Sequence, residues 1–135
     1  MSHKINYNSR AGIIGIRVQG KVPLDEFRDI YFQAVQLAKE KDCFLFLSDF
    51  RNATTSHLTL LEISTLPQTL SEIAARAGID AKRLKRAIVV APKDAATSLF
   101  AQGVTLSQGQ NAKMFQDIAE ARKWLSEVGE TAKVA

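Results

Sequence analysis

Apolar residues along the chain follow two spacings in turn, one typical of strands and one typical of helices. Between residues 13 and 19, Ile14, Ile16 and Val18 alternate with small or polar residues. A period of two is the pattern of a strand with one buried face. Residues 4–8 are also rich in strand-forming side chains, and a short link at residues 9–12 joins the two segments. We therefore expect the chain to begin with a β-hairpin.

A helical spacing begins after Pro23. Asp25 and Glu26 then fall in the first turn, where acidic side chains complement the helix dipole. Apolar residues recur three and four positions apart as far as residue 38, which predicts one stripe that packs on a sheet. The stripe consists of Phe27, Ile30, Tyr31, Ala34, Val35 and Ala38.

The continuous apolar run at residues 44–48 predicts a central strand that is covered on both faces and ends at residue 48. Residues 58–77 have a helical spacing, but Pro67 interrupts it, so we expect a kink or two short helices. Gly78 is well suited to the position that follows this helix. Its apolar stripe consists of Leu66, Leu70, Ile73 and Ala77.

The last third of the chain predicts two more strands and two more helices. Residues 87–91 read as a buried strand, and residues 111–116 as a short final one. Asp94 is placed to cap the helix between them, and Asp117 opens a capping box for the last helix. The first of these helices carries Ala96, Leu99, Phe100 and Val104, and the second carries Ile118, Ala121, Trp124, Leu125 and Val128.

Strands that alternate with helices imply parallel crossovers, so the expected fold class is α/β. We expect a mostly parallel five-stranded sheet with an initial β-hairpin and about four packed helices. The length of 135 residues fits one domain over residues 1–135. A chain with 46% hydrophobic and 24% charged residues is typical of globular proteins and not of disordered ones.

Charge and cysteine content narrow the picture only slightly. A formal net charge of +4 is too small to argue for an anionic partner by itself. Cys43 has no second cysteine to pair with, which fits a cytoplasmic protein, and we expect it to be a buried core residue. No apolar stretch approaches the roughly 20 residues of a membrane span. Residues 1–8 contain no apolar signal core, so we expect no export.

Three stretches of the chain resemble a known family. They are residues 16–22 (IRVQGKV), residues 46–51 (FLSDFR), and residues 89–91 together with residues 113–125. With the order of elements, they resemble the STAS superfamily, the fold of anti-sigma-factor antagonists. More specifically, they resemble its SpoIIAA-like group, whose fold is related to CRAL-TRIO lipid-carrier domains. The resemblance covers residues 5–126 and implies docking, dimerisation or small-ligand binding.

The segment after the third strand is the first candidate site, because ligands of open α/β sheets bind beyond the carboxyl ends of the strands. Asp49 and Arg51 either bind a polar ligand head together or pair with each other or with backbone, and we favour the pairing. His57 has no second ligand at metal-binding spacing, so no metal site is expected. Ser48, His57 and Asp49 lack the strand–turn–helix elbow of a nucleophilic serine, so no catalytic triad is expected.

The same segment contains a candidate phosphoacceptor. Anti-sigma-factor antagonists carry a phosphorylated serine or threonine just before their second main helix, and Thr54, Thr55 and Ser56 stand at about that place. The acidic-serine-serine-glycine pattern of those regulators is missing here. The favoured interpretation is that Ser56 or a neighbouring threonine caps the helix.

Two further features leave several interpretations open. Leu58, Leu60, Leu61 and Ile63 lie partly off the stripe of their helix, so they belong to the core, to a dimer or partner surface, or to a lid over an apolar ligand. The basic residues at 82–86 are best explained as a solvated turn before a strand. No aromatic residue lies between Phe50 and Phe100, which argues against nucleic-acid binding.

The sequence thus favours a non-enzymatic STAS-like module without a cofactor, which docks a regulatory protein partner and forms a homodimer. The alternative is a carrier or sensor for a small apolar or amphipathic, lipid-like ligand under the helix that Pro67 interrupts.

Overall fold

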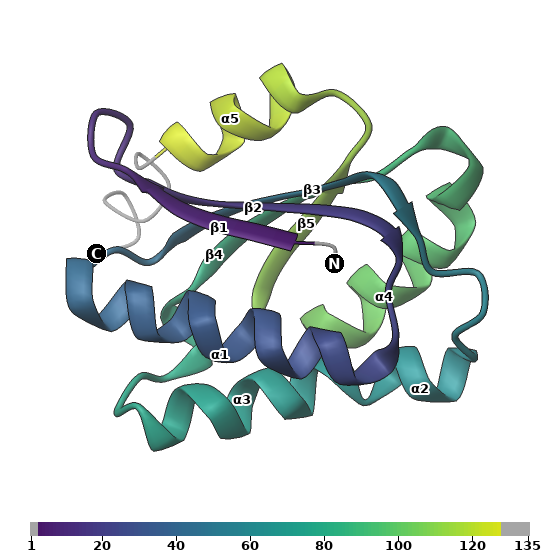
Figure 1. Ribbon diagram of the computed structural model, residues 1–135, viewed down its shortest axis with the longest axis horizontal. Helices are drawn as coiled ribbons and strands as arrows, with labels where there is room; N and C mark the ends of the chain where they lie inside the picture. The colour runs from purple at the N-terminus through teal and green to yellow at the C-terminus, as the bar shows by residue number, and fades with distance from the viewer. Residues whose placement is uncertain (1–2, 128–135) are drawn as a thin grey trace.

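A computed structural model describes residues 3–127 and contains one five-stranded sheet with helices on both faces (Figure 1). The strands lie side by side in chain order. They are β1 (His3–Asn8), β2 (Ile13–Lys21), β3 (Leu45–Thr54), β4 (Lys85–Val89) and β5 (Asn111–Phe115). The α-helices are α1 (Leu24–Lys41), α2 (Leu60–Ser64), α3 (Leu66–Arg76), α4 (Ala95–Ser107) and α5 (Ile118–Ser126). Two short 3-10 helices, η1 (Ala81–Arg83) and η2 (Pro92–Asp94), complete the chain.

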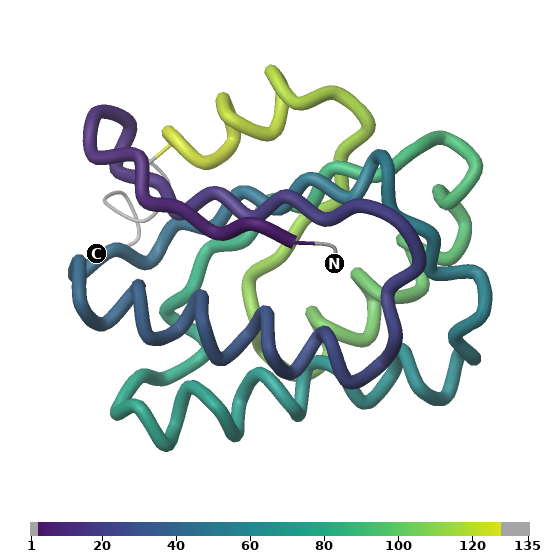
Figure 2. Tube along the Cα trace, viewed as in Figure 1, coloured from purple at the N-terminus to yellow at the C-terminus, as the bar shows by residue number. Residues whose placement is uncertain are grey.

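β1 and β2 form the expected antiparallel hairpin, and β2 to β5 are parallel to their neighbours. Each parallel strand is added on the same side of the previous one, so right-handed crossovers bring α1, α2, α3 and α4 to one face of the sheet. The trace in Figure 2 shows α5 alone crossing to the other face. The α/β class and the mostly parallel sheet are confirmed.

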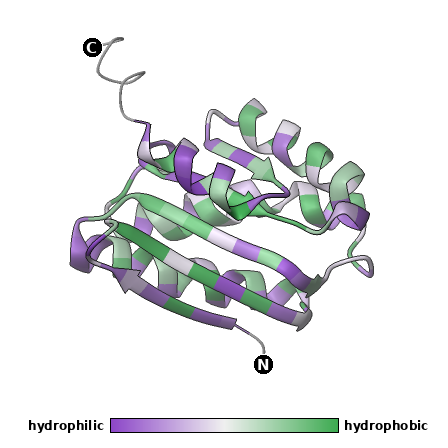
Figure 3. Ribbon diagram, turned by 90° about the horizontal axis from the view of Figure 1, so that it is seen from above, coloured by the Kyte–Doolittle hydropathy of each residue, from purple (hydrophilic) through white to green (hydrophobic). Residues whose placement is uncertain are grey.

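Side chains of a strand point alternately to the two faces of the sheet, so the core forms two layers. Figure 3 shows hydrophobic and hydrophilic residues following one another along the strands. The larger layer lies under α1 and α3 and includes Ile14, Phe46 and Leu70. The smaller layer lies under α5 and includes Val89 and Leu125. Cys43 is buried, as expected.

Several local predictions are confirmed. The stripe of α1 faces the core. Pro67 lies in the first turn of α3 and separates it from α2, so the segment forms two helices. Gly78 follows the end of α3 with a φ of +81°, a conformation that glycine adopts without strain. Val128, predicted on the last helix, lies outside the described residues.

The prediction that the third strand ends at residue 48 is wrong. β3 continues to Thr54, because a register shift between Arg17 and Gln19 lets β2 keep pairing with it as far as Lys21 and Thr54. Ala53, one of these added residues, is buried. Asp49 and Arg51 therefore belong to a strand and not to a loop.

The prediction of a solvated basic turn is wrong for the residues at its end. Leu84 is fully buried and β4 begins at Lys85. The Lys85 ammonium donates to the backbone oxygen of Trp124 at 2.7 Å on the α5 face. Because side chains alternate, Arg86 points to the opposite face, where it is only 7% exposed.

The apolar residues of α4 predicted its buried face wrongly. Ser98 and Thr105 are buried, whereas Leu99 is 65% and Leu106 is 50% exposed. The inward face is polar partly because Gln102 accepts a hydrogen bond from the Met114 amide of the edge strand β5, at 2.7 Å. Asp94 stands at the N-cap position of α4, as predicted, but its side chain makes no capping hydrogen bond.

None of the helices in residues 3–127 is long and apolar enough to cross a membrane.

Candidate functional site

A pocket of about 130 Å³ lies between the sheet and the helices α1, α3 and α4, and is partly open to solvent. Its floor is formed by side chains of β2 to β5 that point to this face, among them Ile16, Phe46, Ile88 and Met114. α1 contributes Phe27, Ile30 and Tyr31, and the junction of α2 and α3 contributes Ile63, Leu66 and Pro67. Ala101 and Thr105 of α4 close another side. The lining is therefore mostly apolar and mostly built on regular elements.

Packed aromatic rings form part of one wall of this pocket. Phe27 of α1 stacks on Phe50 of β3 with ring centroids 5.8 Å apart and an interplanar angle of 9°. Tyr31, one turn further along α1, lies 6.3 Å from the Phe27 ring. Aromatic contacts of this kind add stability beyond the area that they bury.

Arg86 is the one basic residue among those that line the pocket. Its Nη2 donates to Oε1 of Gln110 at 3.0 Å. Gln110 is itself fixed, because its Nε2 donates to the Pro67 carbonyl at 2.8 Å and to Ser71 Oγ at 2.9 Å. These bonds connect the start of α3 to the loop before β5 and hold the arginine in place.

Burial shifts the ionisation of two facing groups. Removal from water lowers the pKa of Arg86, and it raises the pKa of Tyr31 even though the positive charge of Arg86 acts to lower it. Arginine stays protonated in proteins despite such shifts, and Tyr31 stays neutral at neutral pH. The apolar pocket thus contains a positive charge next to a neutral hydroxyl.

The residues predicted as one candidate site are divided between three places. Thr55, Leu58 and Ile63 line the pocket. Leu60 and Leu61 are 55% and 77% exposed, so they are neither core nor pocket residues. Because side chains alternate along β3, those of Asp49 and Arg51 lie on the same face of the sheet as Leu47 and α5, opposite to the pocket.

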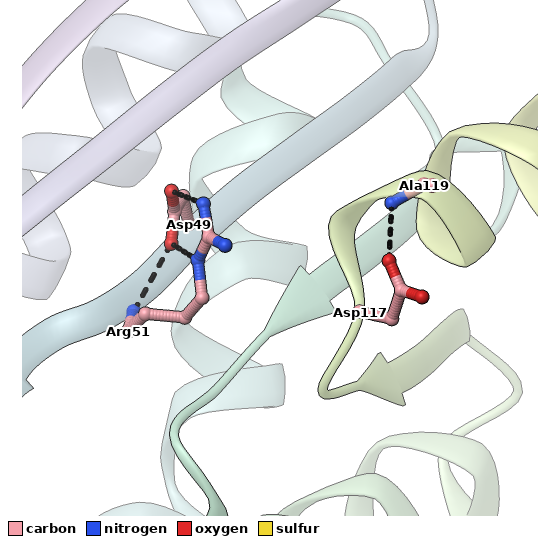
Figure 4. Close-up of polar contacts among 4 residues, drawn as sticks. All are labelled: Asp49, Arg51, Asp117 and Ala119. Carbon is pink, nitrogen blue, oxygen red and sulfur yellow. Dashed lines mark hydrogen bonds and ion pairs between the residues drawn. The ribbon is translucent and has the colours of Figure 1, made fainter.

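Asp49 and Arg51 pair with each other, which is the alternative that the sequence favoured (Figure 4). Arg51 Nε and Nη2 donate to the two carboxylate oxygens at 2.9 and 2.8 Å, and the Arg51 amide donates at 3.1 Å. The hydrogen bond from Arg51 lowers the pKa of Asp49, and the same bond raises the pKa of Arg51. Asp117, shown beside them, uses its carboxylate to cap α5 through the Ala119 amide at 2.8 Å.

His57 has a structural contact. Its Nε2 lies 2.8 Å from the carbonyl oxygen of Val22, to which it donates, and this joins the segment before α2 to the end of β2. Among residues 3–127, no group of three histidine, cysteine, aspartate or glutamate side chains is arranged to hold a metal ion.

Thr59, and not Ser56 or an earlier threonine, caps α2. Its hydroxyl accepts from the Glu62 amide at 3.0 Å, while Glu62 Oε1 accepts from the Thr59 amide at 2.9 Å. The signal was the spacing Thr-Leu-Leu-Glu of a capping box, which the sequence analysis overlooked. Ser56 and Thr54 are exposed, and the phosphoacceptor hypothesis for residues 54–56 stays a prediction.

Arg86, Tyr31 and Gln110 are the functional candidates that sequence reasoning missed. Arg86 was hidden in a basic run, and Tyr31 in an apolar stripe. The one available signal was the position of Arg86 beside the apolar residues 87–91, which allows it to be the second residue of a buried strand.

The comparisons with known proteins agree with this fold. The SpoIIAA-like family model matches residues 13–126, which is most of the chain and includes β2 to β5 and all five α-helices. No curated protein sequence matches the chain. On the strength of the family match, the chain belongs to the SpoIIAA-like family of the STAS superfamily.

Proposed function

We propose that this SpoIIAA-like domain is a non-enzymatic cytoplasmic module that binds a small, largely apolar ligand in the pocket beneath α1, α3 and α4, as a carrier or a sensor. The observation that carries the proposal is the pocket itself, whose volume of about 130 Å³ is close to that of engineered apolar cavities, about 150 Å³, that bind benzene. A mostly apolar lining with a few polar groups is the common composition of small-molecule sites.

Native mass spectrometry of the freshly purified chain, and titration with benzyl alcohol and 1-hexanol followed by NMR, test this function. We expect chemical-shift changes at residues that line the pocket. Ala101→Phe fills the pocket from α4 and should abolish them. Ala96→Phe places the same side chain on the exposed face of the same helix and should leave them intact. Chemical-shift changes that persist in Ala101→Phe would overturn the proposal. A wild type that shows neither chemical-shift changes nor a co-purified adduct would also overturn it.

A second candidate function is docking, which SpoIIAA-like domains commonly carry out with regulatory protein partners. Its supporting observation is the outer face of α4. Leu99, Gly103 and Leu106 recur along one side of this helix, and α4 contains no charged residue. Exposed apolar faces without charged residues are typical of protein–protein interfaces. The glycine in the middle of this face allows a second helix to approach closely. We propose a second copy of the chain as the occupant, paired helix to helix about a two-fold axis.

Light scattering across a range of protein concentrations tests the dimer. We expect a dimer for the wild type and a monomer for Leu99→Gln/Leu106→Gln. Phe32→Gln is the matched control, because Phe32 is a 56% exposed apolar residue on α1, and it should remain dimeric. A wild type that is monomeric at every concentration contradicts this second candidate and leaves the ligand-binding proposal standing.

A further inference from the structure

Arg86 is a buried cation without a carboxylate partner. It is 7% exposed, and no ion pair to it is formed by any aspartate or glutamate in residues 3–127. Its Nε is a buried donor that has no hydrogen-bond acceptor among those residues. Buried charges are almost always paired, because an unpaired one loses its hydration without compensation. The guanidinium therefore lacks an anion on the side of Nε.

The groups around Arg86 do not supply this anion. Gln110 is neutral, and Tyr31 is kept neutral because burial raises its pKa. Asp94 also lines the pocket, but it pairs with Lys93 at 3.5 Å and makes no ion pair with Arg86. The missing negative charge has to come from outside this part of the chain.

The donors available in the pocket match a carboxylate. Nε is the donor of Arg86 that has no partner among the described residues, and its neighbour in the planar fork, Nη2, has a second proton besides the one that it donates to Gln110. Tyr31 also lines the pocket, and its neutral hydroxyl can donate to an oxygen of the same ligand. A phosphate dianion fits less well, since the pocket offers one cation only and also contains Asp94.

Resting on the ligand-binding function proposed above, we propose that the pocket binds a small monocarboxylate. The carboxylate pairs with Nε of Arg86 and with the Tyr31 hydroxyl, and an apolar body of roughly benzene size fills the space between Phe46, Ile88 and Ala101.

Two matched pairs of probes test this inference at pH 7: benzoate against benzyl alcohol, and hexanoate against 1-hexanol. Dissociation constants can be measured by calorimetry or NMR titration of the full chain. We expect each acid to bind about 10- to 100-fold more tightly than its matched alcohol, which is the ratio expected for hydrogen bonds to a charged group. Arg86→Met should remove this preference, so that benzoate binds no more tightly than benzyl alcohol and hexanoate no more tightly than 1-hexanol.

Gln110→Glu is a second variant that keeps the arginine. It places a carboxylate where Gln110 already accepts from Arg86, and it should weaken the acids selectively by pairing with the cation internally. This variant decides the matter if Arg86→Met does not fold.

The possible results separate the two proposals. Acids and alcohols that bind equally to the wild type would overturn the carboxylate site and leave ligand binding intact. A preference for acids that survives in Gln110→Glu would also overturn it. If neither class of probe binds, both proposals fall.

Discussion

Two arginines of this chain show how differently the same side chain is used. Arg51 is exposed and forms two parallel hydrogen bonds with Asp49, whereas Arg86 is buried and its Nε has no acceptor among residues 3–127. Pairs at the surface are screened by water and contribute little to stability, but an unpaired buried cation is costly. The second arrangement therefore points to function more strongly than the first, although the sequence drew attention to the first.

The Asp49–Arg51 pair predicts a specific loss of stability in acid. Arg51 lowers the pKa of Asp49 below its ordinary value of 3.8, so the folded state binds this proton less readily than the unfolded state does. The stabilisation is complete above pH 3.8 and disappears as the pH falls through the lower, folded pKa. Urea unfolding should show a difference between the wild type and Asp49→Asn that is constant near neutrality and shrinks below that pH.

Arg51→Met provides the control for this prediction. It removes the group that lowers the pKa of Asp49, so Asp49→Asn in that background should change stability little at any pH. A difference between wild type and Asp49→Asn that stays constant down to the strongest acid tested would contradict the assignment.

At the scale of single elements, apolar periodicity predicted most of the fold because the larger core layer imposes it. The stripe of α1 and the break at Pro67 follow directly from spacing and from proline chemistry. The predictions fail where contacts between distant segments determine the end of a strand or the buried face of a helix. β3 runs to Thr54 only because β2 bulges beside it, and α4 faces outward with its leucines.

The pocket could not be predicted for a related reason. A strand that begins one residue earlier or later reverses which side chains are buried. Because β4 begins at Lys85, Arg86 and Ile88 face the pocket, and Ala87 faces α5. The apolar residues that follow the basic run at residues 82–86 allow Arg86 to join the strand, but they do not indicate at which residue the strand starts.

The capping box of α2 is the prediction that belongs to this scale. Thr59→Ala removes the hydroxyl oxygen that accepts a hydrogen bond from the Glu62 amide. It should lower the free energy of unfolding by about 1 kcal/mol, a typical value for loss of an N-cap. Thr59→Ser keeps the hydroxyl and should recover most of the loss. Ser56→Ala serves as the neighbouring control, with an expected change within about 0.5 kcal/mol. If Ser56→Ala is the more costly change in urea titrations, the cap has been placed wrongly.

For the whole molecule, the two core layers share one sheet. Leu47 and Phe46 are neighbours in β3, yet the first packs under α5 and the second under α1 and α3. We therefore expect a change in one layer to affect the other through the backbone of the same strands. The order β1-β2-β3-β4-β5 places no break between them, so we expect the described chain to unfold as one unit.

Trp124 allows this expectation to be measured, because it is the one tryptophan of the sequence and lies in the α5 layer, 5.8 Å from the Phe115 ring. Leu70 is fully buried in the opposite layer, and Leu70→Ala should destabilise the protein by about 2–5 kcal/mol. In a single cooperative unit, the unfolding midpoint by Trp124 fluorescence shifts as far as the midpoint by far-ultraviolet circular dichroism. Leu125→Ala, in the layer of Trp124 itself, should shift both probes in the same way. A fluorescence midpoint that stays unchanged in Leu70→Ala, while the circular dichroism midpoint falls, would show that the layers unfold separately and that the pocket layer can open without α5.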